Sequence, residues 1–313
     1  MSGLELVEVT SGLRFPEGPI AMPDGSVILV EMFGPRVTRV HPDGTKETIA
    51  EIPGGPNGAA IGPDGALYLC NNGGCFSPVD LGEFLFPGPF DPARYIGGRV
   101  QRLDLTTGEV TDLYTECDGH PLRAPNDIVF DTHGGMWITD HGIHDTAART
   151  ADLTSIYYAL LDGSSITEVV HPVDSPNGIG LSPDGTHVYW AETHHGRVMQ
   201  RVVTAPGVVE PPSPLDFSAC LHGLVGYQLL DSLAVDGEGN VCVATLANGG
   251  ITVISPDGTS VEHFATGDPL TTNICFGDDD GSGEYRTAYI TLSGTGKLVK
   301  ARWPYRGLRL NYL

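Results

Sequence analysis

The sequence predicts a single all-β domain over residues 1–313, a six-bladed β-propeller with four-stranded antiparallel blades and a ring closed by the N-terminal strand. A short motif recurs six times at intervals of about fifty residues, and an apolar, β-rich run follows each copy. The 42 glycines and 24 prolines are spread along the chain and not gathered in one linker, which is typical of many tight turns within one domain.

Each repeat opens with the recurring motif. The six copies are PEGPIAMPDG at 16, PNGAAIGPDG at 56, PNDIVFDTHG at 125, PNGIGLSPDG at 176, LDSLAVDGEG at 230 and TNICFGDDDG at 272. Runs such as SVILVEM and HVYWAE follow, and Asp-Gly pairs between the runs indicate hairpin turns. A third run, such as RVTRV, and a fourth then complete the four antiparallel strands of one blade.

The end of the chain predicts how the ring closes. The last repeat stops near Trp303 after three runs, so we expect the N-terminal run LELVEVT to supply its outer strand. A closed ring of blades leaves few exposed sheet edges, which favours a propeller over an open sheet of the same strands.

Charge and composition narrow the classes of partner. The formal charge of -22 excludes the basic surface that nucleic acids and anionic membranes require. We expect no membrane span, because no apolar run is long enough, and the start MSGLELVEVTSGL does not resemble a signal peptide. The six cysteines form no CxxC pair. These features predict a cytoplasmic protein, a monomer or homodimer, that acts on a small molecule.

Aligning the six motifs places an oxygen-bearing side chain at one register position in every repeat. Because first strands are innermost in a propeller, these side chains should meet at one end of the axis, where buried polar groups need partners. Oxygen-only ligands favour a hard cation, and Ca²⁺ accepts such a set in looser geometry than Mg²⁺. We predict one divalent cation, with Ca²⁺ favoured, Zn²⁺, Mn²⁺ or Mg²⁺ as alternatives, and an axis filled by water as the metal-free alternative. The six residues are Glu17, Asn57, Asn126, Asn177, Asp231 and Asn273.

Three long connections are expected to surround this end of the axis. They are the Phe- and Pro-rich insertion Gly74–Gly98, the segment HGIHDTAARTADL after Asp140, and residues 211–230 before Asp231. Such loops build concave, partly apolar ligand sites. Besides the cation ligands, we expect substrate-binding or supporting roles for Asn57, Arg123, Asp140, His141, Glu192 and Asn273.

The motifs also carry a family resemblance. FPEGP, APNDIVFD, SPNGIGLSPDG and LDSLAVDGEGNVCVAT resemble segments of the senescence marker protein (regucalcin)/gluconolactonase/luciferin-regenerating-enzyme family, over nearly the whole chain. The resemblance implies a six-bladed propeller with an axial divalent ion, often Ca²⁺. It implies Glu17, Asn126, Asn177 and Asp231 as ligands, with Asp231 also the base. The long Phe- and Pro-rich insertion is not a general feature of that family.

The expected function is therefore a metal-dependent lactonase that opens a small, sugar-lactone-like ring by water attack. The cation would polarise the carbonyl, and Asp231 would remove a proton from the water. One alternative is a phosphotriester or fluorophosphate hydrolase, or a divergent lyase or isomerase, on the same site. Another is a calcium-binding propeller without catalysis, because one fold hosts many functions.

Overall fold

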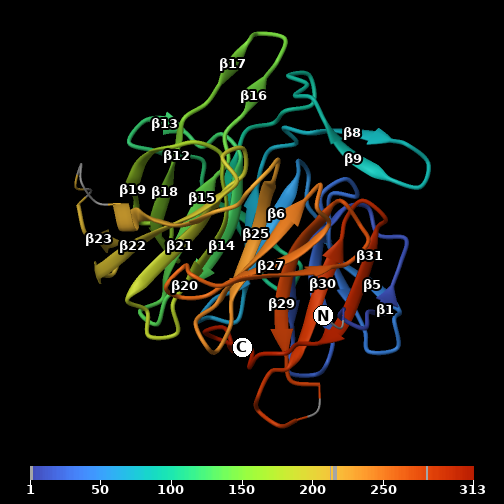
Figure 1. The fold of residues 1–313 in the computed structure, drawn as a ribbon. Coiled ribbons are helices and arrows are strands. Elements are labelled where there is room, and N and C mark those ends of the chain that lie inside the picture. Colours follow the sequence, from blue (N-terminus) through green and yellow to red (C-terminus); the bar gives the residue numbers. More distant parts are fainter. Residues whose placement is uncertain (1–2, 212, 214–216, 280) are drawn as a thin grey trace.

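The computed structural model describes residues 3–211, 213, 217–279 and 281–313, and it is a ring of six antiparallel β-sheets (Figure 1). Blade 1 has β2 (Pro16–Ala21), β3 (Val27–Glu31), β4 (Arg36–Val40) and β5 (Lys46–Glu51). Blade 2 has β6 (Pro56–Ile61), β7 (Leu67–Asn71), β10 (Arg99–Leu103) and β11 (Val110–Tyr114). Blade 3 has β14 (Pro125–Phe130), β15 (Gly135–Asp140), β18 (Thr154–Leu160) and β19 (Ile166–Val173).

The second half of the chain repeats this pattern. Blade 4 has β20 (Pro176–Leu181), β21 (His187–Glu192) and β22 (Arg197–Ala205), with both β23 (Val208–Val209) and β24 (Cys220–Gly223) paired to β22. Blade 5 has β25 (Leu229–Val235), β26 (Val241–Leu246), β27 (Gly250–Ile254) and β28 (Val261–Ala265). Blade 6 has β29 (Thr271–Gly277), β30 (Thr287–Leu292) and β31 (Lys297–Arg302).

The N-terminal strand closes the ring as the sequence predicts. β1 (Val7–Thr10) pairs antiparallel with β31, with Val7 opposite Lys300, and becomes the outer strand of blade 6. The innermost strands contact one another in the order β2, β6, β14, β20, β25, β29 and back to β2. The six-bladed propeller is confirmed.

The hydrophobic core lies between the blades. At the junction of blades 2 and 3, Tyr68 and Phe130 meet edge to face with ring centroids 5.0 Å apart. At the closing junction of blades 6 and 1, Leu29, Tyr289 and Leu298 pack together. Second strands such as β3, β7 and β26 are buried along almost their whole length, so each reads as a nearly continuous apolar run and not as an alternating one.

Each innermost strand is irregular at its ring position. In all six blades the register with the second strand shifts at the aligned Glu, Asn or Asp. Such bulges re-aim a side chain, and they are frequent next to functional sites. In three blades a glycine follows the ring residue and allows neighbouring strands to approach, since a Cβ at Gly58 would lie 2.5 Å from Asp127 Cα and one at Gly178 2.2 Å from Leu233 N.

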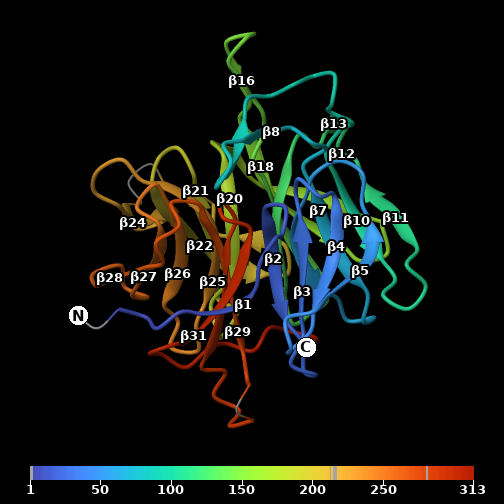
Figure 2. The same ribbon diagram turned by 90° about the vertical axis from the view of Figure 1, so that its right-hand side faces the viewer.

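The insertions extend from one end of the ring. The segment Gly74–Gly98 forms a hairpin of β8 (Ser77–Asp80) and β9 (Leu85–Gly88), and β16 (His144–Asp145) pairs with β17 (Thr150–Ala151). Both hairpins rise from the same end, and the C-terminus lies at the other end (Figures 1 and 2). A small hairpin, β12 (Glu116–Cys117) with β13 (His120–Pro121), and one 3-10 turn, η1 (Phe217–Ala219), complete the described elements.

The hairpin β8–β9 crosses from blade 2 to blade 6. The Leu85 N–H donates to the carbonyl of Gly294 over 2.8 Å, in the turn that joins β30 to β31. Leu85 also packs with Phe15, Met32 and Leu270 of blades 1 and 6. The insertion is therefore held as a fixed wall over part of the axis.

All six cysteines are free, and Cys220 alone among them is exposed. Within the described ranges, no helix has the length and apolar character needed to cross a membrane.

Candidate functional site

Five of the six ring side chains lie at the floor of a cavity at the insertion end of the axis. Glu17, Asn57, Asn126 and Asn177 are buried, and Asp231 is half-buried beside them. All five line one cavity of about 890 Å³. The inner strands place them there because each strand presents its second or third residue toward the axis at the irregular register.

Two of these side chains leave a buried oxygen without a partner. Asn126 Oδ1 and Asn177 Oδ1 have no hydrogen-bond partner among the described residues. The other end of Asn177 is fixed, because its Nδ2 donates to Thr193 Oγ1 over 3.2 Å. An unpaired buried amide oxygen is costly, so two of them beside two carboxylates fit a site for a cation.

Negative charge is concentrated at this floor. Burial raises the pKa of Glu17 well above its usual range, and the nearby charge of Asp231 raises it further. Burial also raises the pKa of Asp231 to about 7, against a hydrogen bond from Asn177 that lowers it. Carboxylates held close together in a desolvated place are destabilised as anions unless a positive charge is bound between them.

The ring side chains that could coordinate a cation offer oxygen atoms as ligands. In the part of the chain that the structure describes, no group of three or more His, Cys, Asp and Glu side chains could hold a metal ion. The ring instead combines two carboxylates with amide oxygens. This combination fits the oxygen coordination of Ca²⁺ better than the His and Cys coordination of structural zinc.

The walls of the cavity are mostly apolar. The insertion Gly74–Gly98 supplies one wall, and blades 1, 5 and 6 supply the adjoining side. Tyr227 and Leu229, from the described part of the segment before Asp231, line it as well, whereas residues 212 and 214–216 of that segment lie outside the described residues. The apolar lining includes Phe15, Met32, Phe76, Val79, Phe84, Phe86, Leu246 and Leu270.

Comparison with known protein families shows the family of this chain. The family model described as "SMP-30/Gluconolactonase/LRE-like region" matches residues 15–294, which include all six ring positions. The chain belongs to this family. The family assignment that the sequence motifs suggested is confirmed.

Known proteins and solved structures resemble this chain over most of its length. The lactonase drp35 of Staphylococcus epidermidis is 25% identical over 280 residues, which cover 88% of this chain and 74% of that protein. The gluconolactonase XC5397 of Xanthomonas campestris superposes with a TM-score of 0.73 at 20% identity, over 95% of this chain and 89% of that one. The calcium-binding protein regucalcin of Agrobacterium tumefaciens superposes with a TM-score of 0.72 at 18% identity, over 99% and 98%. These structures share its fold.

In this SMP-30/gluconolactonase/LRE-like propeller, Arg123 joins the two insertions and does not line the cavity. Its Nε donates to Asp152 Oδ2 over 2.8 Å, and its guanidinium carbon lies 5.9 Å from the centre of the Tyr95 ring. Tyr95 belongs to the first insertion and Asp152 to the second. The geometry gives Arg123 a role in holding the walls.

Asp140 and Glu192 also lie outside the cavity lining. Both end a second strand, opposite the proline that opens the first strand of the same blade. Asp140 accepts backbone N–H groups from Arg123, Ala124 and Gly142 at 2.6–3.0 Å, and Glu192 accepts from Arg197 Nε at 2.8 Å. Asp140 therefore shapes the loop that leads into the ring residue Asn126.

Histidines line the cavity on the side of blades 3 and 4. His141, His144 and His194 lie with ring centroids 4.4–6.2 Å apart. Burial lowers the pKa of His141 to about 4, so its imidazole is neutral near pH 7. His141 Nδ1 lies 3.1 Å from the carbonyl of Gly142, which favours the tautomer with the proton on Nδ1 and Nε2 as acceptor.

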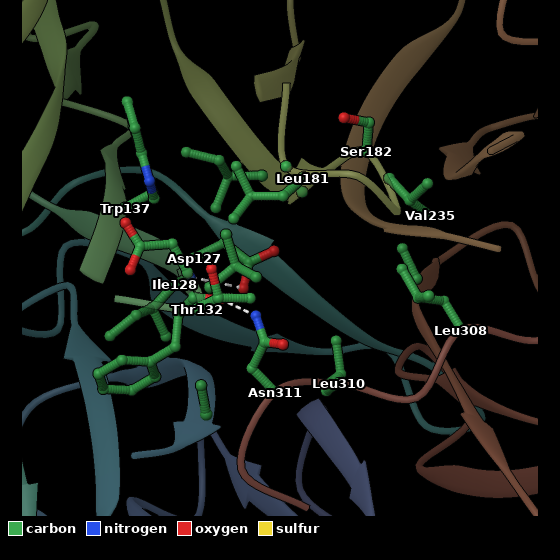
Figure 3. Close-up of a pocket in the computed structure, with 18 of the residues that line it drawn as sticks. Asp127, Ile128, Thr132, Trp137, Leu181, Ser182, Val235, Leu308, Leu310 and Asn311 are labelled. Atoms are coloured by element: carbon green, nitrogen blue, oxygen red, sulfur yellow. Dashed lines mark hydrogen bonds between the residues drawn. The ribbon is translucent and has the colours of Figure 1, made fainter. Parts of the chain in front are cut away.

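A second cavity of about 360 Å³ lies on the other side of the ring, and sequence reasoning missed it. Figure 3 shows Leu308, Leu310 and Asn311 of the C-terminal segment facing Trp137 and Leu181 across it. Asn311 Nδ2 donates to the carbonyl of Phe130 over 3.0 Å, which holds the segment under the axis. The segment after Trp303 has no repeat pattern from which its position at the second cavity could have been predicted.

Asp127 is the other residue that sequence reasoning missed. It follows Asn126 and lines the second cavity, and burial raises its pKa to about 7. Its charge acts on both Glu17 and Asp231, so three carboxylates, not two, surround the axis. The signal was present in the sequence, because this motif reads Pro-Asn-Asp where two others read Pro-Asn-Gly.

Asn273, the sixth ring residue, lines the second cavity and not the first.

Proposed function

We propose that this protein is a metal-dependent lactonase that opens a small lactone by water attack at the axial site. The observation that carries the proposal is the pair of unpartnered oxygens, Asn126 Oδ1 and Asn177 Oδ1, beside the carboxylates of Glu17 and Asp231 at the floor of a cavity. The chemistry is supported by the family model and by the lactonase drp35, the relative aligned over 88% of this chain.

The residues that would hold the cation are Glu17, Asn126, Asn177 and Asp231. Their oxygens are hard donors of the kind that Ca²⁺ prefers. The pKa values of Glu17 and Asp231 are raised because the two carboxyl groups are removed from solvent and lie near other carboxylates. A divalent cation bound there supplies Lewis-acid polarisation of the substrate carbonyl.

Asp231 is our candidate base. It is the more exposed of the two cavity carboxylates: Asp231 is half-buried, whereas Glu17 is 2% exposed. Glu17 also accepts a hydrogen bond from Asn273. Asp231 removes a proton from the attacking water, the water oxygen bonds to the lactone carbonyl carbon, and the ring C–O bond breaks. The alkoxide oxygen takes up a proton, and the product is a hydroxy acid.

The remaining ring and mouth residues support this chemistry. Asn57 lines the cavity and is proposed to face the substrate. Asn273 orients Glu17, and Arg123, Asp140 and Glu192 position the loops of the mouth. His141 offers a neutral acceptor to a substrate hydrogen.

A panel of lactones with purified, metal-analysed protein tests the proposal. We expect hydrolysis that chelator abolishes and added Ca²⁺ restores. Turnover that survives chelation in protein shown to be free of metal would exclude metal dependence. Hydrolysis of phosphotriesters without hydrolysis of any lactone would assign a phosphotriester hydrolase to the same residues, and stoichiometric Ca²⁺ with no turnover of either class would favour a binding propeller.

A further inference from the structure

The wall of the cavity above the ring has two chemically different sides. On the side of the hairpin β8–β9 and blades 1 and 6, the lining side chains above the ring residues are apolar. On the side of blades 3 and 4, His141, His144 and His194 face the same space. The polar ring oxygens lie at the floor between the two sides.

The apolar side includes large side chains that are exposed and not buried in the core. Leu81 is 65% exposed and Phe86 is 45% exposed, and both lie on the hairpin β8–β9 at the mouth of the cavity. Tyr227, from the segment before Asp231, is 78% exposed and lines the same mouth. Large apolar side chains gathered at the opening of a cavity are typical of a surface that binds an apolar partner.

The apolar wall is held in place. The hydrogen bond from Leu85 N–H to the Gly294 carbonyl fixes the far end of the hairpin to blade 6, and Leu85 is buried against Phe15 and Leu270. Near the base of the insertion, the Tyr95 hydroxyl donates to the Arg123 carbonyl over 2.5 Å. A hairpin fixed at both ends presents Leu81, Phe84 and Phe86 to the cavity without a large ordering cost on binding.

A polyhydroxylated ring would be poorly matched to this wall. Each hydroxyl placed against Phe84, Phe86 or Val79 would lose its hydrogen bonds to water and gain none from the protein. A hydrocarbon substituent placed there would instead leave water at a gain of about 0.8 kcal/mol per methylene. The cavity of about 890 Å³ has room for a lactone ring over the floor together with such a substituent.

We propose that the substrate is a lactone that carries a hydrocarbon substituent of several carbons, and not a polyhydroxylated sugar lactone. This inference rests on the proposed lactonase function and names the substrate class of that site. The substituent lies against the hairpin β8–β9, and the lactone ring lies over the ring oxygens with its polar edge toward the histidines.

The test compares kcat/KM for γ-butyrolactone, its γ-alkyl derivatives with side chains of increasing length, and glucono-δ-lactone. We expect kcat/KM to rise by about fourfold per methylene until the wall is covered, with glucono-δ-lactone the poorer substrate. In parallel, the Asp231→Asn protein is titrated with the same unreacted lactones by calorimetry, which measures binding without turnover.

Matched variants locate the effect on the hairpin. Leu81→Ser and Phe86→Ser are expected to lower kcat/KM for the longest lactone by about tenfold relative to γ-butyrolactone. Leu160→Ser is the control, because Leu160 is also an exposed leucine, 41% exposed, but lies at the end of β18 and does not line the cavity. Melting temperatures of all three variants check that the fold is intact.

The outcomes separate this inference from the proposed function. Lactone hydrolysis that is independent of chain length, or fastest for glucono-δ-lactone, would overturn the inference and leave the lactonase in place. Chain-length-dependent binding to Asp231→Asn without turnover by the wild type would support the apolar ligand and overturn the lactonase. Neither binding nor turnover of any lactone would overturn both.

Discussion

Asn273 Nδ2 donates to Glu17 Oε2 over 3.3 Å, so a residue of the last blade fixes a carboxylate of the first. The Oδ1 of Asn273 accepts the N–H of Ile274 at 2.8 Å, which leaves this side chain with little capacity to coordinate a cation itself. The contact crosses the junction where the ring closes. We interpret Asn273 as a residue that orients Glu17.

Replacing Asn273 should therefore weaken cation binding without abolishing it. We expect Asn273→Ala to lower the affinity for Ca²⁺ by about 10- to 100-fold, the usual effect of losing a group that supports a ligand. The measurement is the melting temperature as a function of Ca²⁺ concentration. Asn311→Ala, which removes the hydrogen bond to Phe130 far from the cation site, is the control and should leave the Ca²⁺ dependence unchanged.

The cation should contribute to the stability of the fold. An ion that binds the native state alone adds about 2.7 kcal/mol to the free energy of unfolding at about 100 times its Kd. Chelator should lower the melting temperature and Ca²⁺ should restore it, with a smaller response in Glu17→Gln and Asn177→Ala. A melting curve that chelator leaves unchanged, in protein with analysed metal content, would contradict the axial site.

Asp231 should be needed for turnover more than for folding. We expect Asp231→Asn to retain the fold and part of its metal, since an amide oxygen still coordinates. Turnover of the best lactone should fall by at least about 100-fold, the scale on which a general base contributes. Turnover and bound metal are measured in the same samples at saturating Ca²⁺. A metal-loaded variant with wild-type turnover would remove Asp231 from the mechanism.

The hairpin β8–β9 should determine substrate choice and not metal binding. Ser77 and Gly88 are opposite each other in the hairpin, so a short Gly-Ser link can replace the residues between them and keep the Tyr95 contacts. We expect the ranking of lactones by kcat/KM to change while metal content stays near one ion per chain. An unaltered ranking would show that the wall does not contact the substrate.

Burial of His141 should make the fold less stable in acid. His141 is neutral in both the folded and the unfolded protein above about pH 6.5. Between about pH 6.5 and about pH 4 only the unfolded protein takes up a proton on this side chain, so the free energy of unfolding decreases as the pH is lowered. From pH 7.5 to 4.5, the free energy of unfolding should decrease by about 2 to 3 kcal/mol more in the wild type than in His141→Gln.

The raised pKa values of Glu17 and Asp231 increase the stability of the fold as the pH is lowered, which opposes the effect of His141. Those carboxylates are present in both proteins, so their contribution cancels in the difference. His120→Gln, at an exposed histidine of β13, is the control. Equal pH dependence in the wild type and His141→Gln would show that His141 is not desolvated in solution.

The blades and the ring positions could be predicted from the sequence because their signals are local. Apolar strand runs, Asp-Gly turns and a motif repeated six times depend on residues close together in the chain, and aligning the repeats was enough to place Glu17 and Asp231 at one register. The closing role of β1 followed from counting the strands of the last repeat. The family motifs then suggested the same four cation ligands.

The surroundings of the site were decided only by the tertiary structure. The pairing of Arg123 with Asp152, the bond from Leu85 to Gly294 and the C-terminal segment under the axis join parts of the chain that carry no shared pattern. Asp127 raises the pKa of Glu17 from a different inner strand, and the glycine at position 58 lets that strand lie close to β6. Periodicity reports which face of a strand is buried, whereas contacts between distant loops depend on the packing of the whole ring.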